Sequence, residues 1–232
     1  AASDVYKRQI SATVFVEETY DMVNNELIIT DSRLLSKDEV MAIGVDNFAP
    51  LSEVPMPRAA TITRGRLTIT FSGVYNTSNG VSCNLTGTAH WDDSGLHTEG
   101  ENYCATGEDF IGVTWSGSFT AKSHSISGKN QLGGALTIYN SDSTPNAGRV
   151  WSFKDSNPTS KYTLYAKDIN LNVNISKNTL TGNGNTAEAV LKYIHTYSKV
   201  KGSISITPGS ETVAGSFSLS TVSYTHLRAH ET

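Results

Sequence analysis

Two histidines and a glutamate in the middle of the chain could bind a metal ion. His90 and His97 lie on either side of a turn signal at residues 92–95 (Asp-Asp-Ser-Gly), and Glu99 follows two residues later. A two-residue hairpin loop at the centre of this signal would pair His90 with His97 and put Glu99 on the same face as His97. Imidazole and carboxylate groups placed in this way could hold zinc or a similar ion. The alternative is that both histidines simply face solvent. We predict no cofactor, with a metal ion at these three residues as the one exception.

The same hairpin would bring the two cysteines together. Cys83 and Cys104 are equally far from the centre of the turn, so the loop would place them directly opposite each other. Facing residues of an antiparallel pair lie about 4.5–5.5 Å apart at Cα, a separation that a disulfide can bridge. We therefore predict a Cys83–Cys104 disulfide, with two unpaired buried thiols as the alternative.

Large aromatic side chains are a second kind of group that could bind a ligand. Flat rings on an exposed face can stack on sugars, whereas rings in a core cannot. Trp91 at a hairpin end and Trp151 in a short strand are the best candidates for exposure, while Trp115 alternates with apolar residues. Core packing of Trp91 and Trp151 remains the favoured interpretation.

The sequence nominates no catalytic residue. It contains no G-x-S-x-G, H-E-x-x-H, C-x-x-C or P-loop pattern. Residues 182–187 match the G-x-G-x-x-A dinucleotide pattern, but the apparent strand before them alternates with asparagine, so we predict a hairpin turn. A hydrolase with a dispersed pair of carboxylates remains an alternative. The acidic residues around the predicted hairpin lack the spacing of a calcium loop and are predicted to be solvated: Asp92, Asp93, Glu99, Glu101, Glu108 and Asp109.

Alternating strands must position these side chains. From Thr61 onward, apolar residues alternate with hydroxyl or amide residues, as in segments 67–72, 111–119 and 169–175. This pattern is typical of antiparallel strands with one solvated face, and Gly-, Asn- and Pro-containing turn signals separate the runs. We predict an all-β fold, an antiparallel β-sandwich of about nine or ten strands.

A short N-terminal helix precedes the strands. Ser36 and Glu39 form a capping-box pattern, and Gly44 is a plausible end of the helix. Three prolines between residues 50 and 57 then indicate an extended lead-in. Residues 185–200 fit either a helix or a strand, and we favour a strand because residues 193–197 are rich in β-branched and aromatic side chains.

Composition excludes several classes of protein. Of the 232 residues, 17% are charged, below the roughly 25% usual for soluble domains, and 55 are Ser or Thr. The net charge of −4 argues against a nucleic-acid or anionic-membrane partner. No stretch approaches the ~18 consecutive apolar residues of a membrane span. Hydrophobic residues make up 38% of the chain, enough for a core, which argues against disorder.

The two ends of the chain match each other at the level of DNA. Residues 4–9 (Asp-Val-Tyr-Lys-Arg-Gln) can be encoded by GAT GTG TAT AAG AGA CAG. The reverse complement, read from its third base, encodes Val-Ser-Tyr-Thr-His and then a codon that begins with C, as in residues 222–227. Both ends therefore resemble a translated transposon-type sequencing adaptor. We expect residues 1–9 and 222–232 to be non-native.

The remaining sequence divides into two parts. Residues 10–57 are expected to hold a signal-peptide remnant, the short helix and the Pro-containing lead-in, with a strand as the alternative for residues 10–16. Residues 58–221 are expected to form the β-sandwich, truncated at its C-terminal end. The predicted disulfide and the hydroxyl-rich composition both indicate an oxidising, extracellular setting.

We therefore predict a secreted or cell-surface, non-enzymatic β-sandwich that acts in adhesion, as a structural module or as an interaction module. Its partner would be a protein or a glycan at the cell exterior, with no nucleic acid and no membrane span. The alternative is a carbohydrate-binding module that uses Trp91 and Trp151. A hydrolase with a dispersed site is the third interpretation.

Overall fold

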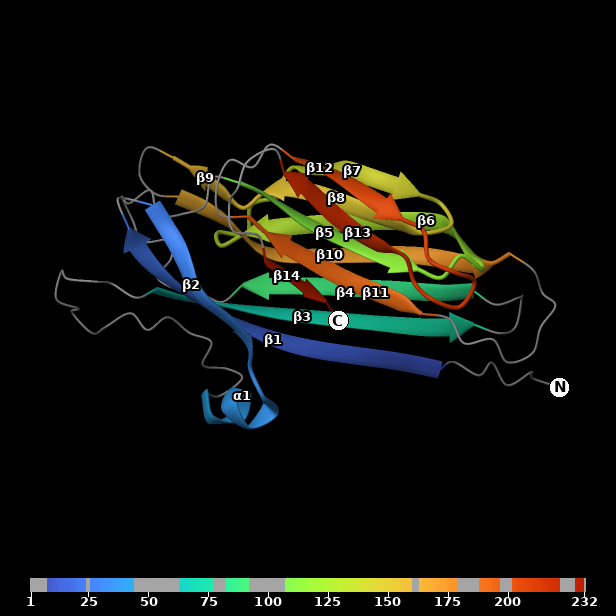
Figure 1. The fold of residues 1–232 in the computed structure, drawn as a ribbon, viewed down its shortest axis with the longest axis horizontal. Helices are drawn as coiled ribbons and strands as arrows, with labels where there is room; N and C mark the ends of the chain where they lie inside the picture. Colours follow the sequence, from blue (N-terminus) through green and yellow to red (C-terminus); the bar gives the residue numbers. More distant parts are fainter. Residues whose placement is uncertain are drawn as a thin grey trace.

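The fold is almost entirely antiparallel β-sheet (Figure 1). The computed structural model describes fourteen strands and one helix, more strands than the sequence predicts. None of the helices in the described part of the chain is long and apolar enough to cross a membrane. The residues that the structure describes are 8–23, 26–43, 63–76, 82–91, 107–159, 163–178, 188–196, 202–221 and 228–231.

The strands form three sheets. The large sheet has the order β2-β1-β3-β4-β10-β6, with β9 also paired to β10, and the small sheet has the order β14-β11-β5-β8-β7. The strands β12 and β13 pair only with each other, as a hairpin layer. The bounds of the large-sheet strands are β1 Arg8–Val23, β2 Glu26–Leu34, β3 Thr63–Asn76, β4 Ser82–Trp91, β6 Phe119–Asn130, β9 Ser156–Pro158 and β10 Thr163–Lys177. The others are β5 Glu108–Trp115, β7 Ile138–Thr144, β8 Gly148–Lys154, β11 Ala189–His195, β12 Gly202–Thr207, β13 Ser216–Thr221 and β14 Arg228–Glu231.

The large and small sheets pack face to face, so the predicted β-sandwich is confirmed. Alternate residues of each strand point into the space between the sheets, because side chains on a strand alternate in direction. The Leu191 side chain of β11 packs directly on the backbone of Gly87 in β4, where a Cβ atom would lie 2.9 Å from it. The shared core includes Val16, Leu67, Ile69, Ile111, Val113, Trp115, Leu171, Val173, Leu191 and Tyr193.

The hairpin layer covers the other face of the small sheet. Phe217 of β13 packs with Phe110, Val150 and Ile194, which point away from the sandwich core. The approach is tightest at Gly112 of β5, where a Cβ atom would lie 2.8 Å from the Phe217 ring. Strand β5 is therefore buried on both faces. The prediction of one solvated face holds for the large sheet but is wrong for β5.

Two segments for which the sequence left more than one interpretation open are strands. Residues 189–195 form β11, which confirms the strand interpretation of this region. Strand β1 pairs with β3 along most of its length, so residues 10–23 belong to the sandwich and not to a lead-in outside it. The expectation that residues 1–9 and 222–232 are non-native stays a prediction. Arg8, Gln9 and β14 are the structured parts of those segments that are described.

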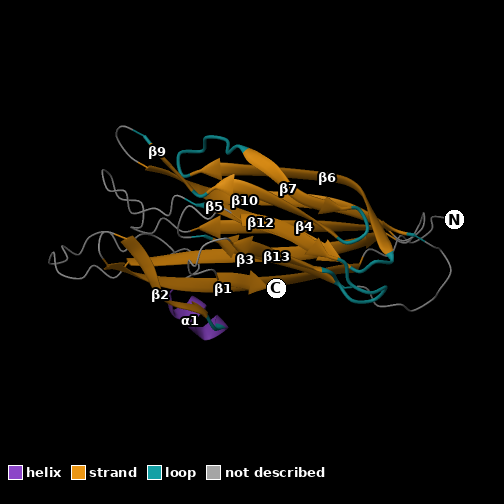
Figure 2. Ribbon diagram, turned by 45° about the horizontal axis from the view of Figure 1, so that its top comes forward, coloured by secondary structure: helices purple, strands orange, loops and turns teal. Residues whose placement is uncertain are grey.

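The predicted helix and its cap are confirmed. Helix α1 spans Lys37–Ile43 and lies beside β1 and β2 (Figure 2). The Ser36 hydroxyl accepts a hydrogen bond from the Glu39 backbone N–H at 3.2 Å, and the Glu39 carboxylate accepts one from the Ser36 N–H at 2.9 Å. These reciprocal bonds satisfy two N–H groups that helix geometry leaves unpaired. Val40 of this helix is buried.

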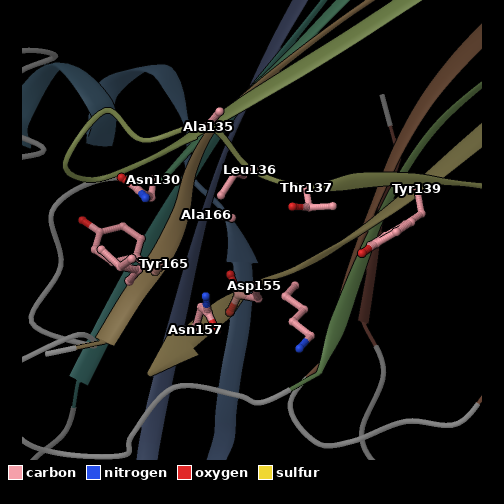
Figure 3. Close-up of a pocket in the computed structure, with 11 residues that line it drawn as sticks. Asn130, Ala135, Leu136, Thr137, Tyr139, Asp155, Asn157, Tyr165 and Ala166 are labelled. Carbon is pink, nitrogen blue, oxygen red and sulfur yellow. The ribbon is translucent and has the colours of Figure 1, made fainter. Parts of the chain in front are cut away.

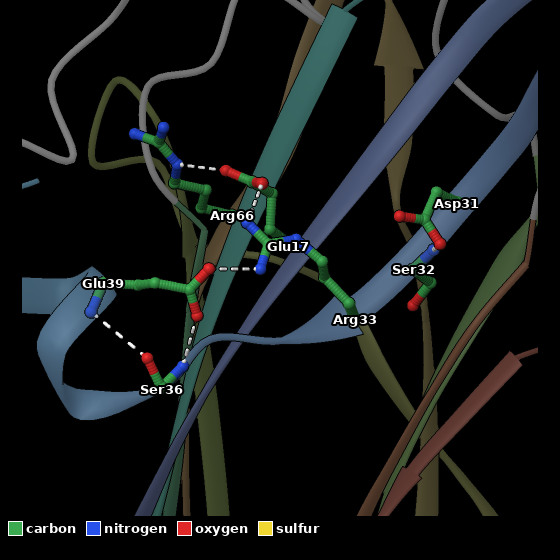
Figure 4. A network of polar contacts seen from close by, with 7 residues as sticks. All are labelled: Glu17, Asp31, Ser32, Arg33, Ser36, Glu39 and Arg66. Atoms are coloured by element: carbon green, nitrogen blue, oxygen red, sulfur yellow. Dashed lines mark hydrogen bonds and ion pairs between the residues drawn. The ribbon is translucent and has the colours of Figure 1, made fainter.

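A chain of charges connects the helix cap to the large sheet (Figure 4). Arg33 of β2 donates to Glu39 at 2.5 Å and to Glu17 of β1 at 3.1 Å. Glu17 also accepts a bond from Arg66 of β3 at 3.1 Å, and both of these side chains are buried. The hydrogen bond from Arg33 is the main cause that lowers the pKa of Glu39 to about 2.

We expect Phe217→Ala to lower the free energy of unfolding by about 3–5 kcal/mol, the range for truncating a buried aromatic ring. The physical reason is the cavity that it would leave over Gly112, between the hairpin layer and the small sheet. Urea unfolding monitored by circular dichroism measures the effect. Val213→Ala, at an exposed position just before β13, is the control and should change stability by less than about 0.5 kcal/mol. Equal effects of the two substitutions would contradict the third layer.

Candidate functional site

Four ionisable side chains from separate segments meet at one end of the space between the sheets. They are Glu18 of β1, Asp109 of β5, Asp155 between β8 and β9, and His195 at the end of β11, and we call them the buried cluster. Glu18, Asp109 and His195 each lie two residues from an inward-facing residue of their own strand, so strand alternation turns them inward as well, and Asp155 follows directly after β8. All four are at most 5% exposed.

Asp109 accepts hydrogen bonds from three donors. Its Oδ2 accepts hydrogen bonds from the Tyr193 hydroxyl at 2.5 Å and from His195 Nδ1 at 2.8 Å. Its Oδ1 accepts a bond from the Thr196 backbone N–H at 2.9 Å. Three donors from one segment therefore fix the position of this carboxylate against β11. Trp91 Nε1 in turn donates to the Tyr193 hydroxyl at 3.2 Å.

His195 lies at the centre of the buried cluster. Its Nδ1 is 3.9 Å from Asp155 Oδ2, and its Nε2 is 4.0 Å from Glu18 Oε2. The Trp91 ring packs on the imidazole with ring centroids 4.9 Å apart. Since Glu18 and Trp91 belong to the large sheet, the cluster joins the two layers of the sandwich.

Asp155 connects the buried cluster to a pocket. The pocket has a volume of about 280 Å³, and Asp155 lies among its lining residues (Figure 3). Its lining mixes amide, hydroxyl, aromatic and aliphatic groups: Asn130, Ala135, Leu136, Thr137, Tyr139, Lys154, Asn157, Leu164, Tyr165 and Ala166. The site is therefore buried but borders a space that could admit a small ligand.

Burial and mutual repulsion disturb the ionisation of the cluster. Loss of hydration and the neighbouring charge of Asp109 raise the pKa of Asp155 to about 8. Burial alone would lower the pKa of His195, but the surrounding carboxylates, Asp109 foremost, outweigh it and raise the pKa to about 10. Burial, followed by the charge of Asp109, raises the pKa of Tyr193 well above its usual value.

The buried cluster has the donor groups of a metal site. Asp109, Asp155 and His195 each offer one ligand atom, and these atoms lie within 4.8 Å of one another. Two carboxylate oxygens and an imidazole nitrogen are ligands for zinc and other first-row divalent ions. The described residues contain no other such group of donors.

The metal residues predicted from sequence are arranged differently. Strand β4 pairs with β3 on one side and β10 on the other, so the predicted hairpin partner has no free edge to join. His90 is half-exposed on the outer face and contacts Asp168 Oδ1 at 2.5 Å. His97 and Glu99 lie outside the described residues. The hairpin register that would have paired His90 with His97 is wrong.

The same pairing removes the basis for the predicted disulfide. Cys83 lies opposite Tyr75 and Ile175 on the neighbouring strands, and its thiol is buried and free. Cys104 lies outside the described residues. No disulfide is found at Cys83, and burial raises the pKa of its thiol to about 11. Such a thiol is a poor nucleophile at neutral pH.

Both candidate sugar-binding tryptophans are buried. Trp91 is 6% exposed and packs against His195 and Tyr193, and Trp151 is 3% exposed beneath Arg149. Core packing of both rings, the favoured interpretation of the sequence, is therefore confirmed, and the alternative of exposed sugar-binding aromatics is wrong. Trp115 is buried, as the alternation of its strand predicts.

Sequence reasoning missed the buried cluster. The prediction that Asp109 is solvated is wrong, and no sequence motif points to Glu18, Asp155 or His195. A signal was present in the alternation of the strands. Asp109 lies an even number of residues from Ile111 and Val113, and His195 lies an even number from Tyr193 and Leu191, so each shares a strand face with apolar residues. Only the fold reveals that the four members of the buried cluster lie together.

The comparisons with known proteins leave the family open. No protein-family model and no curated protein matches the chain. Among solved structures, the chain is similar to the T6 backbone pilin of serotype M6 Streptococcus pyogenes, with 8% identity and a TM-score of 0.30. The match covers 100% of this chain and 64% of that pilin. A similarity this distant supports no conclusion about the fold or the function of the chain.

We expect the free energy of unfolding to fall as pH rises from about 5 to about 9, measured with EDTA present. Asp155 has a pKa of 3.8 when unperturbed and about 8 in the fold, so between these values the native state holds the extra proton. His195 adds the same trend between 6.5 and about 10. Asp109 and Glu18 face these groups and contribute to both pKa shifts, and Tyr193 also lies beside them, hydrogen-bonded to Asp109. Urea unfolding at several pH values measures the trend.

The variant Asp155→Asn provides the control. It removes the titrating carboxyl group, so its stability should decline less between pH 5 and 8 than that of the wild type. A wild-type stability that rises with pH across this interval would contradict the assignment.

Proposed function

We propose that this chain is a non-enzymatic module of the cell exterior that serves a structural or adhesive role. The observation that carries the proposal is that its ionisable and nucleophilic side chains with the most unusual surroundings point into the interior. Asp109, His195 and Tyr193 bond to one another inside the sandwich, and the free thiol of Cys83 is buried. These groups join strands and layers, which is the task of a scaffold.

The surface of the large sheet supports the same proposal. Its outer face carries rows of uncharged polar side chains that lie opposite one another on five adjacent strands, with hydrogen bonds such as Asn172 to Thr86 at 3.1 Å. Such a face is solvated and resists non-specific association. We call this face the hydroxyl grid: Thr13, Thr70, Thr88, Asn170 and Ser127 in one row, and Ser72, Thr86, Asn172 and Ser125 in the next.

Composition supports an exterior location. The hydroxyl-rich, weakly charged sequence is the remaining support for this setting, since the predicted disulfide is not found at Cys83.

Surface accessibility in cells tests the proposal. The full-length gene, epitope-tagged and expressed in its source organism, should give a product that antibody and external protease reach on intact cells. A cytosolic marker protein should stay protected in the same sample. A product that becomes accessible only after lysis would contradict the exterior location.

The hydroxyl grid favours a second candidate function, binding of an uncharged glycan. Hydroxyl and amide groups both donate and accept hydrogen bonds, as sugar hydroxyls do. Facing residues on adjacent strands lie about 4.5–5.5 Å apart, so the grid offers regularly spaced partners to a repeating polymer. The nine grid residues carry no formal charge, which disfavours a charged ligand.

A glycan array probed with the purified chain tests this second candidate. Thr88→Lys places a charge at the centre of the grid and should weaken binding of an uncharged glycan at least tenfold. Thr207→Lys, an exposed threonine on β12, is the matched control and should leave binding unchanged. Absence of wild-type binding to any uncharged glycan, or equal loss in both variants, would exclude the grid as a glycan site.

A further inference from the structure

We propose that Asp109, Asp155 and His195 bind a first-row divalent cation of the zinc type, with Glu18 as an outer partner of the histidine. The inference goes beyond the proposed function and does not depend on it, because it concerns what holds the interior together. It rests on the three donor atoms, on the burial of Asp155 beside the pocket, and on the groups that orient the other two ligands.

The donor set selects the class of ion. One imidazole and two carboxylates suit zinc, manganese or cobalt, whereas calcium prefers oxygen ligands alone. The ligand atoms come from three different segments, β5, the β8–β9 connection and β11. A cation bound to all three would therefore tie the strands of the small sheet together.

Asp155 is the independent observation that points to a ligand. Its side chain is 6% exposed, and its Oδ2 lies 3.9 Å from His195 Nδ1, beyond hydrogen-bond distance. Because buried carboxylates normally have donors or a cation, this group has unused capacity to bind one. It also lines the pocket, which provides a route for an ion.

The other two ligands are already oriented. The Tyr193 hydroxyl and the Thr196 N–H hold Asp109 from two sides. With Nδ1 of His195 directed at the carboxylates, its Nε2 faces Glu18 Oε2 at 4.0 Å. A carboxylate behind a metal-binding histidine is the usual outer-shell arrangement, and it fixes the ring orientation.

Only a small adjustment separates this geometry from a bound state. Two ligands with bonds of about 2.1 Å to a tetrahedral ion lie about 3.4 Å apart. The 2.8 Å between His195 Nδ1 and Asp109 Oδ2 must therefore lengthen by about 0.6 Å. The 3.9 Å from Nδ1 to Asp155 Oδ2 must shorten by about 0.5 Å. On binding, the Nδ1 proton passes to solvent and its lone pair binds the ion.

Charge balance favours a divalent ion at this position. Glu18, Asp109 and Asp155 surround a single imidazole, and all four side chains are almost fully buried. Carboxylates gathered away from water attract a compensating cation, and a divalent ion would offset the charge of two of them.

Calorimetric titration of the chelator-treated full chain with ZnCl₂ tests the proposal. We expect one zinc per chain and a higher melting temperature on binding. Asp155→Asn should weaken zinc binding at least tenfold. The matched control is Asp168→Asn, the same change at a partly exposed aspartate that also contacts a histidine, and it should leave the affinity within about twofold.

Three results would overturn the proposal. They are no stoichiometric zinc binding by the wild type, unchanged affinity in Asp155→Asn, and a larger loss in Asp168→Asn than in Asp155→Asn. The last result would place the ion at His90 on the surface. None of these measurements involves cells or glycans, so the metal site and the proposed function can fail separately.

A second measurement on the wild type covers the case in which Asp155→Asn does not fold. Nitrogen-15 NMR of the histidine rings should show that zinc moves the Nδ1 resonance of His195 and leaves the His90 ring unchanged. A shift of another histidine in place of His195 would exclude the buried cluster as the site.

Discussion

The constraint on which this structure depends is the burial of ionisable side chains where the space between the two sheets continues beyond its last apolar residues. Strands β1, β5 and β11 continue their inward alternation into that space, which leaves Glu18, Asp109 and His195 at most 5% exposed. Charged groups tolerate such a place only when they are paired or neutralised. Removing one partner of a buried pair typically costs about 3–5 kcal/mol, so each member holds the others in place.

The hairpin layer makes the small sheet a firm support for this cluster. Phe110 is adjacent to Asp109 on β5, and strand alternation turns its ring to the opposite face, against the side of Phe217. Thr114 on the same strand donates to the Gly215 carbonyl at 2.7 Å, so the polar group that β5 buries there is satisfied. The strand that carries Asp109 is thus fixed from both sides. Its carboxylate has little freedom to move away from His195.

Local features of the fold could be predicted from sequence, and long-range ones could not. The capping box at Ser36 and Glu39 and the alternation in β3 and β10 depend on neighbours a few residues apart, which the sequence displays directly. The choice of strand partners depends on which surfaces the whole chain can bury. The buried cluster follows from that choice, because its members lie up to 177 residues apart, from Glu18 to His195. Strand alternation alone predicts that Asp109 faces inward, but it does not predict that Asp109 contacts His195.

The failure of the predicted hairpin has a physical cause that also explains the position of the cluster. A turn signal after β4 favoured pairing with the segment that follows, which would have brought Cys83 and Cys104 together. Instead, β4 lies between β3 and β10, whose outer faces carry the same uncharged hydroxyl and amide side chains. Strand β5, the next one described, has apolar residues on both faces, as the adjacent Phe110 and Ile111 indicate. Beside β4, strand β5 would expose Phe110 on a solvated face, whereas in the small sheet the side chains on both faces of β5 are buried. The need to bury the face that carries Phe110 therefore places β5 in the other sheet, and Asp109 enters the interior with it.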